Sequence, residues 1–429
     1  MDDSSPLLSP PFPRPHQKRW EKKQGADFIE CDAVFTRDCH LLCRHDADLS
    51  RSTDAASKFS SKTRNEVIDG VVFSKGVFAA DLTLSEIRSL RARQAKADSL
   101  GRTKAFDGLF PLVTLDEFAA FAARVPVDGG GGQGRWNETS SPSSPPLPPR
   151  RRVVGVHVEA KHPLWHSRTL PRCAADPAAM VDAVASVLRG HGFATPLLNS
   201  SSSSSSSSSR TNISSSKKSS FQTDPRWLRA PTFLQSFEPG ALREAGRRGK
   251  VGEGVPLVQL VDEPAMAVPA GWGGASSSSP AEGNENGNLL TFADLLTDGG
   301  LKRVAEYAHA IGPSVAQVLD FPAKKKKNNT GDDGSENAAA PSFSSLVPRA
   351  SARGLAVHAY TLRDDLVNLE RFKKLKDGAD REAEALFSGA RVEGAFGDFP
   401  LTTARAARKE REEREERRRR RGERGVVSS

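Results

Sequence analysis

The sequence has no apolar run of the ~20 residues that a transmembrane helix needs. Residues 1–20 are acidic at the start and rich in proline, and they lack the charged and apolar regions of a signal peptide. The chain as written is therefore expected to have no transmembrane segment and to be cytoplasmic. If the N-terminus is incomplete, a secretory or organellar route stays open, so the sequence leaves the localisation unknown.

Cysteine is also scarce, because only Cys31, Cys39, Cys43 and Cys173 occur in 429 residues. Their spacing matches no zinc site. Cys31 alternates with two carboxylates along an apolar run, which predicts that it packs on the outer face of a strand. Buried free thiols are the favoured interpretation, with a disulfide as the alternative.

Hydrophobic residues make up only 37% of the chain, because polar low-complexity stretches dilute the rest. The net charge is +9, and residues 405–429 alone carry +5 of it. That tail is charged on all sides and has no aromatic side chains to stack on bases. Its Glu and Arg spacing predicts a solvated helix, and no nucleic-acid partner is expected.

Several polar stretches interrupt the chain without starting a new core pattern, so they are expected to be disordered surface insertions rather than domain boundaries. They lie near 129–152, 199–222, 270–288 and 323–342. The chain therefore divides into a divergent or truncated N-terminus (1–24), one interrupted domain (25–400) and a charged tail (401–429).

Short β-rich runs alternate with helical patterns, which predicts an α/β fold with a parallel sheet. The predicted strands are 28–35, 153–161, 232–237, 256–262, 309–314, 355–362 and 393–399, and the helices include 82–94, 114–125, 176–192, 301–310 and 343–354. Thr83 and Thr114, each followed three residues later by Glu, are predicted helix starts, and Gly354 is a predicted helix end. Seven strands are one short of a (β/α)8 TIM barrel, and the missing strand is the first.

Two of the predicted strands carry charged side chains two residues apart. Glu30 and Asp32 lie in one run, and Glu159 and Lys161 lie in the next. Because side chains alternate along a strand, each pair faces one side of the sheet. Carboxylates placed on an apolar face need a partner, and three of them with one ammonium suit a divalent cation and an anionic substrate.

Eight segments follow one another in an order that resembles a known family. They are GADFIECDAVFTRDCHLLCRHDADLSRSTD, FAADLTLSEIRSLRARQ, FDGLFPLVTLDEF, VHVEAKHPLWH, FLQSFEPGALR, YAHAIGPS, GLAVHAYTLRDD and EGAFGDFP. The chain from about Gly25 to Pro400 resembles the glycerophosphodiester phosphodiesterase family. One such segment is a weak signal, and eight in order are a strong one.

The resemblance implies a TIM barrel that hydrolyses a small-molecule glycerophosphodiester to sn-glycerol 3-phosphate and an alcohol, with Ca2+ or Mg2+ as cofactor. It implies three metal ligands, Glu30, Asp32 and Glu159, and a catalytic acid or base, His45. It also implies a set of substrate-binding residues: Lys161, Gln235, Tyr360 and Arg363. The oligomeric state is not indicated.

One departure from the family concerns its first strand, which ends in His-Arg-Gly and supplies a second catalytic histidine and a phosphate-contacting arginine. Nothing before Gly25 matches it, and His16 is followed by Gln17. A truncated sequence is the favoured explanation. The alternatives are a catalytically impaired relative that binds metal or phosphodiester without turnover, and an interaction protein acting through its charged tail.

Other histidines are predicted to be structural. His157, His309 and His358 are interpreted as packing residues. Trp165 and His166 follow the second carboxylate strand, and the sequence leaves them open between the edge of a substrate cleft and the core.

Overall fold

The computed structural model describes residues 25–125, 154–193, 232–249, 255–269, 290–320, 342–364 and 378–426. The predicted insertions fall outside these ranges, apart from Ser342. No helix among the described residues is long and apolar enough to cross a bilayer.

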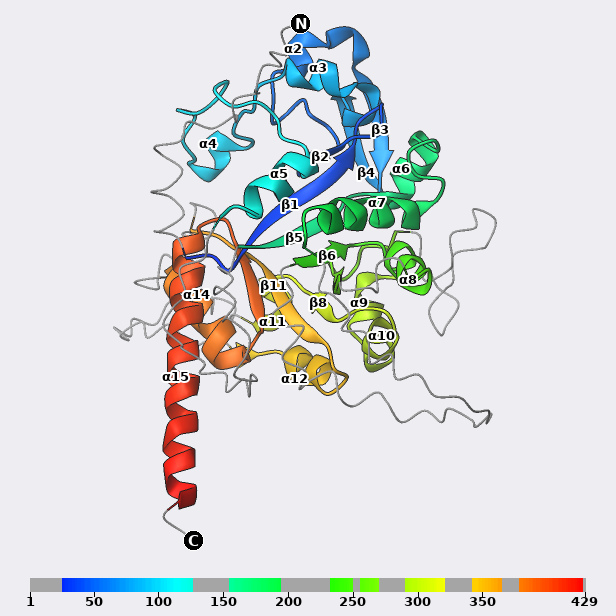
Figure 1. The fold of residues 1–429 in the computed structure, drawn as a ribbon. Helices are drawn as coiled ribbons and strands as arrows, with labels where there is room; N and C mark the ends of the chain where they lie inside the picture. The colour runs from blue at the N-terminus through cyan, green and yellow to red at the C-terminus, as the bar shows by residue number, and fades with distance from the viewer. Residues whose placement is uncertain are drawn as a thin grey trace, which may run out of the picture.

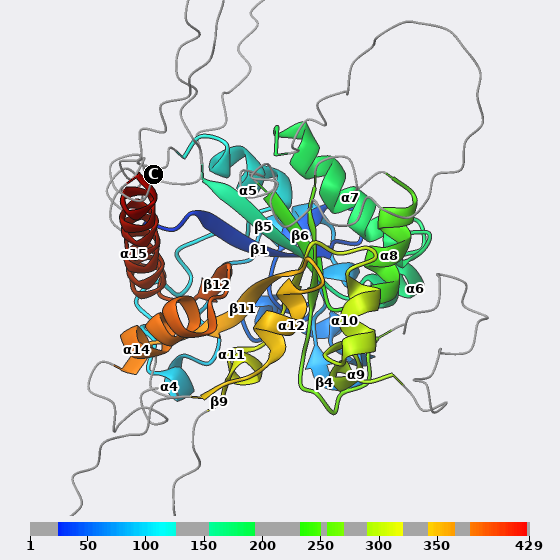
Figure 2. The same ribbon diagram turned by 90° about the horizontal axis from the view of Figure 1, so that it is seen from below.

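Seven parallel strands form a curled sheet at the centre of the fold, and each coincides with one of the predicted runs (Figures 1 and 2). They are β1 (Phe28–Phe35), β5 (Gly155–Ala160), β6 (Thr232–Ser236), β7 (Leu257–Leu260), β8 (Ala310–Gly312), β11 (Ala356–Leu362) and β12 (Gly394–Gly397). They pair in this chain order, and the short strand β2 (Leu41–Cys43) runs antiparallel beside β1. The described strands therefore confirm a barrel-type α/β fold that is one parallel strand short.

Helices cover the outer side of the curled sheet (Figure 2). They are α5 (Leu115–Ala122), α6 (Pro163–Thr169), α7 (Pro177–Gly190), α8 (Pro239–Arg247), α9 (Phe292–Leu295), α10 (Asp298–Val304), α11 (Val315–Val318), α12 (Leu346–Ser351) and α14 (Gly378–Glu384), which continues into a π-helical turn (Ala385–Ala390). The predicted capping box at Thr114 begins α5, and Gly354, with a φ of 77°, follows α12 as predicted.

A long excursion between β2 and α5 carries several small elements. These are α2 (Ala55–Lys58), the hairpin of β3 (Arg64–Ile68) and β4 (Val71–Gly76), α3 (Leu84–Arg88) and α4 (Ala97–Leu100). The capping box predicted at Thr83 begins α3. In the hairpin turn, Asp69 lies 2.5 Å from Nδ1 of His162, the second residue after β5, so the hairpin is attached at the carboxyl end of that strand.

The described residues form two apolar regions, one on each side of the sheet. The larger one lies between the strands and the helices and includes Trp165, and His166 is buried against the Trp165 ring, so neither lies at the edge of a cleft. The smaller one is inside the curl and is formed by Phe233, Val258, Ala310 and Ala356, with Phe28 packed against it.

Two buried histidines complete the inner layer. Nε2 of His157 lies 3.3 Å from Nδ1 of His358, and the ring of Phe233 stacks on His157. Burial lowers the pKa of His358 to about 4, and burial together with His358 holds the pKa of His157 well below its ordinary value. Both rings are therefore neutral packing residues, which confirms the sequence interpretation.

The favoured interpretation of the cysteines as free thiols is wrong. Cys31 forms a disulfide with Cys43, and Cys39 forms one with Cys173. Cys31 does face away from the carboxylates, as predicted, but the antiparallel pairing of β1 and β2 returns Cys43 to the same face. Cys39 and Cys173 are separated by 134 residues in the chain. Their disulfide therefore depends on how the loop after α6 packs.

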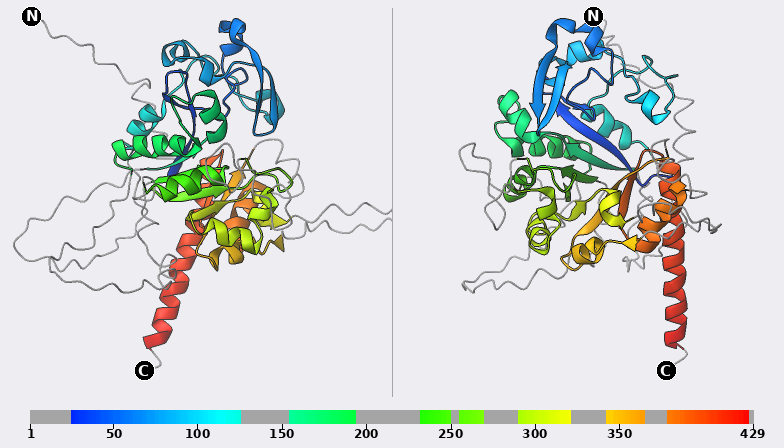
Figure 3. Two further views of the ribbon diagram at one scale, coloured as in Figure 1. Left: turned by 90° about the vertical axis from the view of Figure 1, so that its right-hand side faces the viewer. Right: turned by 180° about the vertical axis from the view of Figure 1, so that it is seen from behind.

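The charged tail forms the long helix α15 (Pro400–Val426), which extends beyond the body of the fold (Figure 3). The expected Glu–Arg pairs four residues apart are present, with Glu410 and Arg414 separated by 2.6 Å. The first turns are packed against the barrel rather than solvated, since Ala406 and Glu410 are buried. The proposed boundaries at residues 24 and 400 stay predictions.

Candidate active site

The carboxylates predicted as metal ligands meet on one face of two neighbouring parallel strands, β1 and β5. Asp32 of β1 is in register with Glu159 of β5, and Glu30 lies one pleat earlier on the same face. One ligand atom from each of these three residues lies within 4.8 Å of the others. The strand pairing therefore brings together acidic groups that are more than a hundred residues apart in the chain.

Lys161, the residue after β5, places its ammonium group against this cluster. Its Nζ lies 3.2 Å from Oε1 of Glu159 and 3.5 Å from Oδ1 of Asp32. The same nitrogen lies 5.7 Å from the ring centre of Phe237, which closes one side of the group. Burial alone would lower the pKa of Lys161, but Asp32 and Glu159 outweigh it and raise that pKa, so the side chain stays charged.

The three carboxylates are not equivalent electrostatically. Burial and then the charge of Asp32 raise the pKa of Glu30 well above its ordinary value, although Glu30 keeps an exposed surface. Burial also raises the pKa of Glu159. Burial opposes the ionisation of Asp32 too, but Lys161 and His45 hold its pKa below the ordinary value. The protein by itself therefore does not favour ionisation of all three carboxylates, whereas a bound cation would.

A fourth oxygen lies next to this cluster. Gln235 of β6 is in register with Glu159 and is 3% exposed. Its Oε1 is buried and has no hydrogen-bond partner among the described residues. A buried acceptor without a donor destabilises a fold unless a ligand satisfies it, so this atom fits a site for a cation or a substrate hydroxyl.

His45 lies at the rim, two residues after β2. The amide N–H of Arg44 donates to the carbonyl oxygen of Asp32 over 2.7 Å, which holds this segment beside the acidic cluster. Nδ1 of His45 lies 2.8 Å from Oδ1 of Asp46, and the imidazole is 76% exposed. The hydrogen bond to His45 lowers the pKa of Asp46. This arrangement leaves Nε2 of His45 directed away from its carboxylate partner.

Of the two remaining predicted residues, Tyr360 lies in β11 and Arg363 directly follows it. The hydroxyl of Tyr360 donates to the carbonyl oxygen of Val261 over 2.7 Å, and its ring packs edge-on against Phe237. Burial raises the pKa of Tyr360, so it remains a phenol. Arg363 is half-exposed, and its Nε lies 3.4 Å from Oδ2 of Asp398.

Sequence reasoning missed two charged residues that the fold brings to this region. Arg102 places Nη2 2.5 Å from Oδ2 of Asp398, although the two residues are 296 positions apart. Lys96, earlier in the same loop, contributes to the lowered pKa of Asp46 after the larger effects of His45 and Lys161. No local pattern marks either residue, because the loop has neither helical nor strand periodicity.

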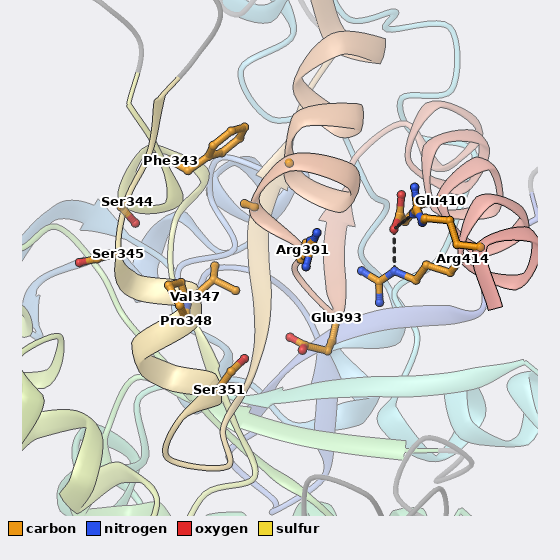
Figure 4. A pocket seen from close by; sticks show the side chains of 13 residues that line it. Phe343, Ser344, Ser345, Val347, Pro348, Ser351, Arg391, Glu393, Glu410 and Arg414 are labelled. Carbon is orange, nitrogen blue, oxygen red and sulfur yellow. Dashed lines mark hydrogen bonds and ion pairs between the residues drawn. The ribbon is translucent and has the colours of Figure 1, made fainter. Parts of the chain in front are cut away.

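A separate hollow of about 810 Å³ lies between α12, the π-helical turn and α15 (Figure 4). Its walls include Val347 and Pro348 on one side and Arg391, Glu410 and Arg414 on the other. None of the predicted site residues lines it. The carboxylate cluster, and not this hollow, therefore remains the candidate active site.

The comparisons with known proteins agree on one family. The sequence model of the Glycerophosphoryl diester phosphodiesterase family matches residues 19–129. Glycerophosphodiester phosphodiesterase GDPD6 of Arabidopsis thaliana is 25% identical over 381 residues, which cover 88% of this chain and 77% of that protein. A glycerophosphodiester phosphodiesterase of Haemophilus influenzae is 22% identical over 389 residues, covering 88% of this chain and 81% of that protein.

Solved structures of the same kind are similar over most of the chain. A glycerophosphodiester phosphodiesterase from Agrobacterium tumefaciens has a TM-score of 0.40 and 15% identity, covering 90% of each chain. An Oleispira antarctica phosphodiesterase, solved with the product sn-glycerol-3-phosphate, has a TM-score of 0.42 and 13% identity, covering 89% of this chain and 85% of that one. In its ordered sequence segments, its family-model match and its curated relatives, this chain is similar to the glycerophosphoryl diester phosphodiesterase family.

Proposed function

We propose that this chain hydrolyses glycerophosphodiesters to sn-glycerol 3-phosphate and an alcohol with the help of a divalent cation, Ca2+ or Mg2+. The observation that carries the proposal is the convergence of Glu30, Asp32 and Glu159 within 4.8 Å on the neighbouring strands β1 and β5. The family-model match supports the reaction class, and the names of the curated relatives support the substrate class.

The residues present fit a hard cation. Carboxylate and amide oxygens are the ligands that Ca2+ and Mg2+ prefer, and Glu30, Asp32 and Glu159 supply three of them beside the unsatisfied oxygen of Gln235. When bound, such an ion acts as a Lewis acid on the phosphate oxygens. These three carboxylates would hold the ion, with the ammonium group of Lys161 beside them.

Lys161 and His45 have different parts in this proposal. Lys161 is a permanent positive charge at the cluster, so it attracts the diester and stabilises the negative charge that grows on its phosphate oxygens. His45 moves a proton to or from an ester oxygen or the attacking water, and Asp46 fixes the orientation of its ring.

The remaining wall residues are proposed to bind the substrate. Gln235 faces the cluster with an unpaired oxygen, which suits a glycerol hydroxyl. Tyr360 supplies a ring that packs on Phe237, and Arg363 supplies a positive charge at the rim.

Hydrolysis of glycerophosphocholine in the presence of Ca2+ or Mg2+, with EDTA to remove the ion, tests the proposal. Glu30→Gln keeps the shape of the side chain but removes its charge, and we expect kcat/KM to fall by more than about 100-fold, since even outer-shell partners of a metal are worth about 10–100-fold. Glu412→Gln, on the exposed part of α15, is the matched control and should leave kcat/KM unchanged.

Three outcomes would count against parts of the proposal. Activity that survives Glu30→Gln or His45→Ala would remove that residue from the catalytic machinery. Activity that persists in EDTA would remove the cation. Binding of Ca2+ without any turnover would identify the chain as a non-catalytic relative of the family.

A further inference from the structure

The hollow between α12, the π-helical turn and α15 has one apolar wall and one charged wall (Figure 4). It is called the α12–α15 hollow here. Its volume is about 810 Å³, and pockets that bind small molecules in proteins have volumes of about 300–1,000 Å³. The hollow therefore has the size of a small-molecule site, and it is separate from the carboxylate cluster because none of the predicted site residues lines it.

The apolar wall holds an aromatic ring that is half open to solvent. Phe343 lies beside Val347 in this wall, in the short strand β10 (Ser342–Phe343), which pairs antiparallel with β9 (Leu319–Asp320). Its ring packs so closely on Gly389 that a Cβ atom at position 389 would overlap it. Phe343 is nevertheless 50% exposed. The apolar part of a ligand in the hollow would cover this surface, which is favourable.

The opposite wall comes mainly from α15, and its charges are paired within that helix. The buried carboxylate of Glu410 lies 2.6 Å from Nε of Arg414 and 3.0 Å from Nη2 of Arg417. Arg417 also lies 3.4 Å from Glu413. These pairs fix the side chains of the wall and already satisfy the two arginines, so they are not the groups that would attract an ion.

Arg391 differs from the other charged residues that line the hollow, since the described part of the chain gives its side chain no ion pair or hydrogen bond. Glu393, two residues later, accepts the amide N–H of Val357 over 2.9 Å. The turn that carries Arg391 is fixed, because its own amide N–H donates to the carbonyl oxygen of Leu386. Figure 4 shows the guanidinium of Arg391 between the two walls.

The two walls together define the chemistry of a ligand. A guanidinium without a protein partner can present two parallel N–H donors to a carboxylate or a phosphate. Three arginines and two glutamates line the hollow, a net charge of +1 when all are ionised, which favours an anion over a cation. The exposed ring on the other wall favours an apolar group attached to that anion.

We propose that the α12–α15 hollow is a second binding site, for an amphiphilic anion. The ligand class is a small molecule with a carboxylate or phosphate head and an apolar chain or ring. Arg391 binds the head, and Phe343 contacts the apolar body. The site does not depend on the proposed hydrolysis, because it uses none of the residues assigned to that reaction.

Binding of decanoate, measured by calorimetry in EDTA at concentrations where it is monomeric, tests the proposal. Decanoate has a carboxylate head and an apolar tail, but no phosphate that the candidate active site would recognise. Acetate keeps the head without the tail, and decyltrimethylammonium keeps the tail with the opposite charge. We expect each of them to bind at least about 10-fold more weakly than decanoate, since each lacks one of the two contacts.

Substitutions on the two walls test the two contacts separately. Arg391→Gln should weaken decanoate binding by about 10-fold or more, and its control is Arg381→Gln, an exposed arginine of α14 that does not line the hollow. Phe343→Ser should weaken it by about fivefold or more, and its control is Val72→Ser, an exposed apolar residue of β4. Both controls should bind decanoate within about twofold of the wild type.

Arg391→Gly separates lost binding from lost folding. Residue 391 has a left-handed φ of 65°, which glycine adopts without strain. The variant should therefore keep or raise the Tm of the wild type while it loses the same affinity as Arg391→Gln. Unchanged decanoate affinity in both Arg391 variants would overturn the inference, as would a wild type that does not bind decanoate or binds decyltrimethylammonium equally well.

Discussion

The inside of the barrel has two layers of opposite character, although the same strands supply both. On β5, His157 and Glu159 are neighbours on one face. In the lower layer, His157 and His358 lie among aromatic rings, and burial keeps both neutral. In the upper layer, Glu159 lies beside two further carboxylates and the charged Lys161.

The difference shows how counter-charge and solvent access decide what a barrel interior can hold. The lower layer has no counter-charge among the described groups that contact the histidines, so neutral imidazoles are the only stable form there. The upper layer contains a lysine and opens toward solvent through Glu30. We therefore expect the lower layer to determine stability and the upper layer to determine ion binding.

The largest effect is expected from Phe233→Ala, which should change the stability set by the lower layer and leave ion binding in the upper layer unchanged. Phe233 is buried in the lower layer, and removing its ring should lower the free energy of unfolding by about 3–5 kcal/mol. Urea unfolding measures this change, and calorimetry with Ca2+ should find the ion affinity unchanged. A parallel loss of Ca2+ affinity would show that the layers are not independent.

A smaller effect, but one that reaches the upper layer, is expected from Cys31→Ser combined with Cys43→Ser. Cys31 lies between Glu30 and Asp32, and its disulfide closes a loop with a separation of 12 residues. Its loss should lower the free energy of unfolding by about 2–4 kcal/mol, and Ca2+ affinity should fall as well because β1 is no longer tied to β2. Unchanged ion affinity would mean that strand pairing alone holds the ligands in place.

The smallest effect concerns the pH dependence of stability. The pKa of His358 is about 4 in the folded protein and about 6.5 in an unfolded chain, so only the unfolded chain takes up this proton between these values. The stability from a neutral His358 is complete above pH 6.5 and is lost as the pH falls toward 4. Each such histidine steepens the fall by at most about 1.4 kcal/mol per pH unit.

Urea unfolding at pH 7 and pH 5 measures this slope in the wild type and in His358→Leu. The variant should show a shallower fall, because one group that must stay neutral is gone. An identical slope in both proteins would place the acid sensitivity in other groups, such as His309, whose pKa is also lowered to about 4 by burial.

Much of the fold was predictable because its signals are local. All seven parallel strands, the capping boxes at Thr83 and Thr114 and the helix end at Gly354 depend on residues within a few positions of one another. The alternation of Glu30 with Asp32 likewise identifies one face of a strand from the sequence alone. The disulfides were not predictable in this way, since neither pair has a local signature.

The sequence by itself determined which residues form strands, which face of each strand is charged and therefore where acidic groups would collect. Only the tertiary structure decided that Cys39 meets Cys173, that His166 is buried and that Arg102 meets Asp398. The physical reason is that periodicity and capping act over one or two turns of chain. Contacts between loops depend instead on how the whole barrel packs, which no short segment encodes.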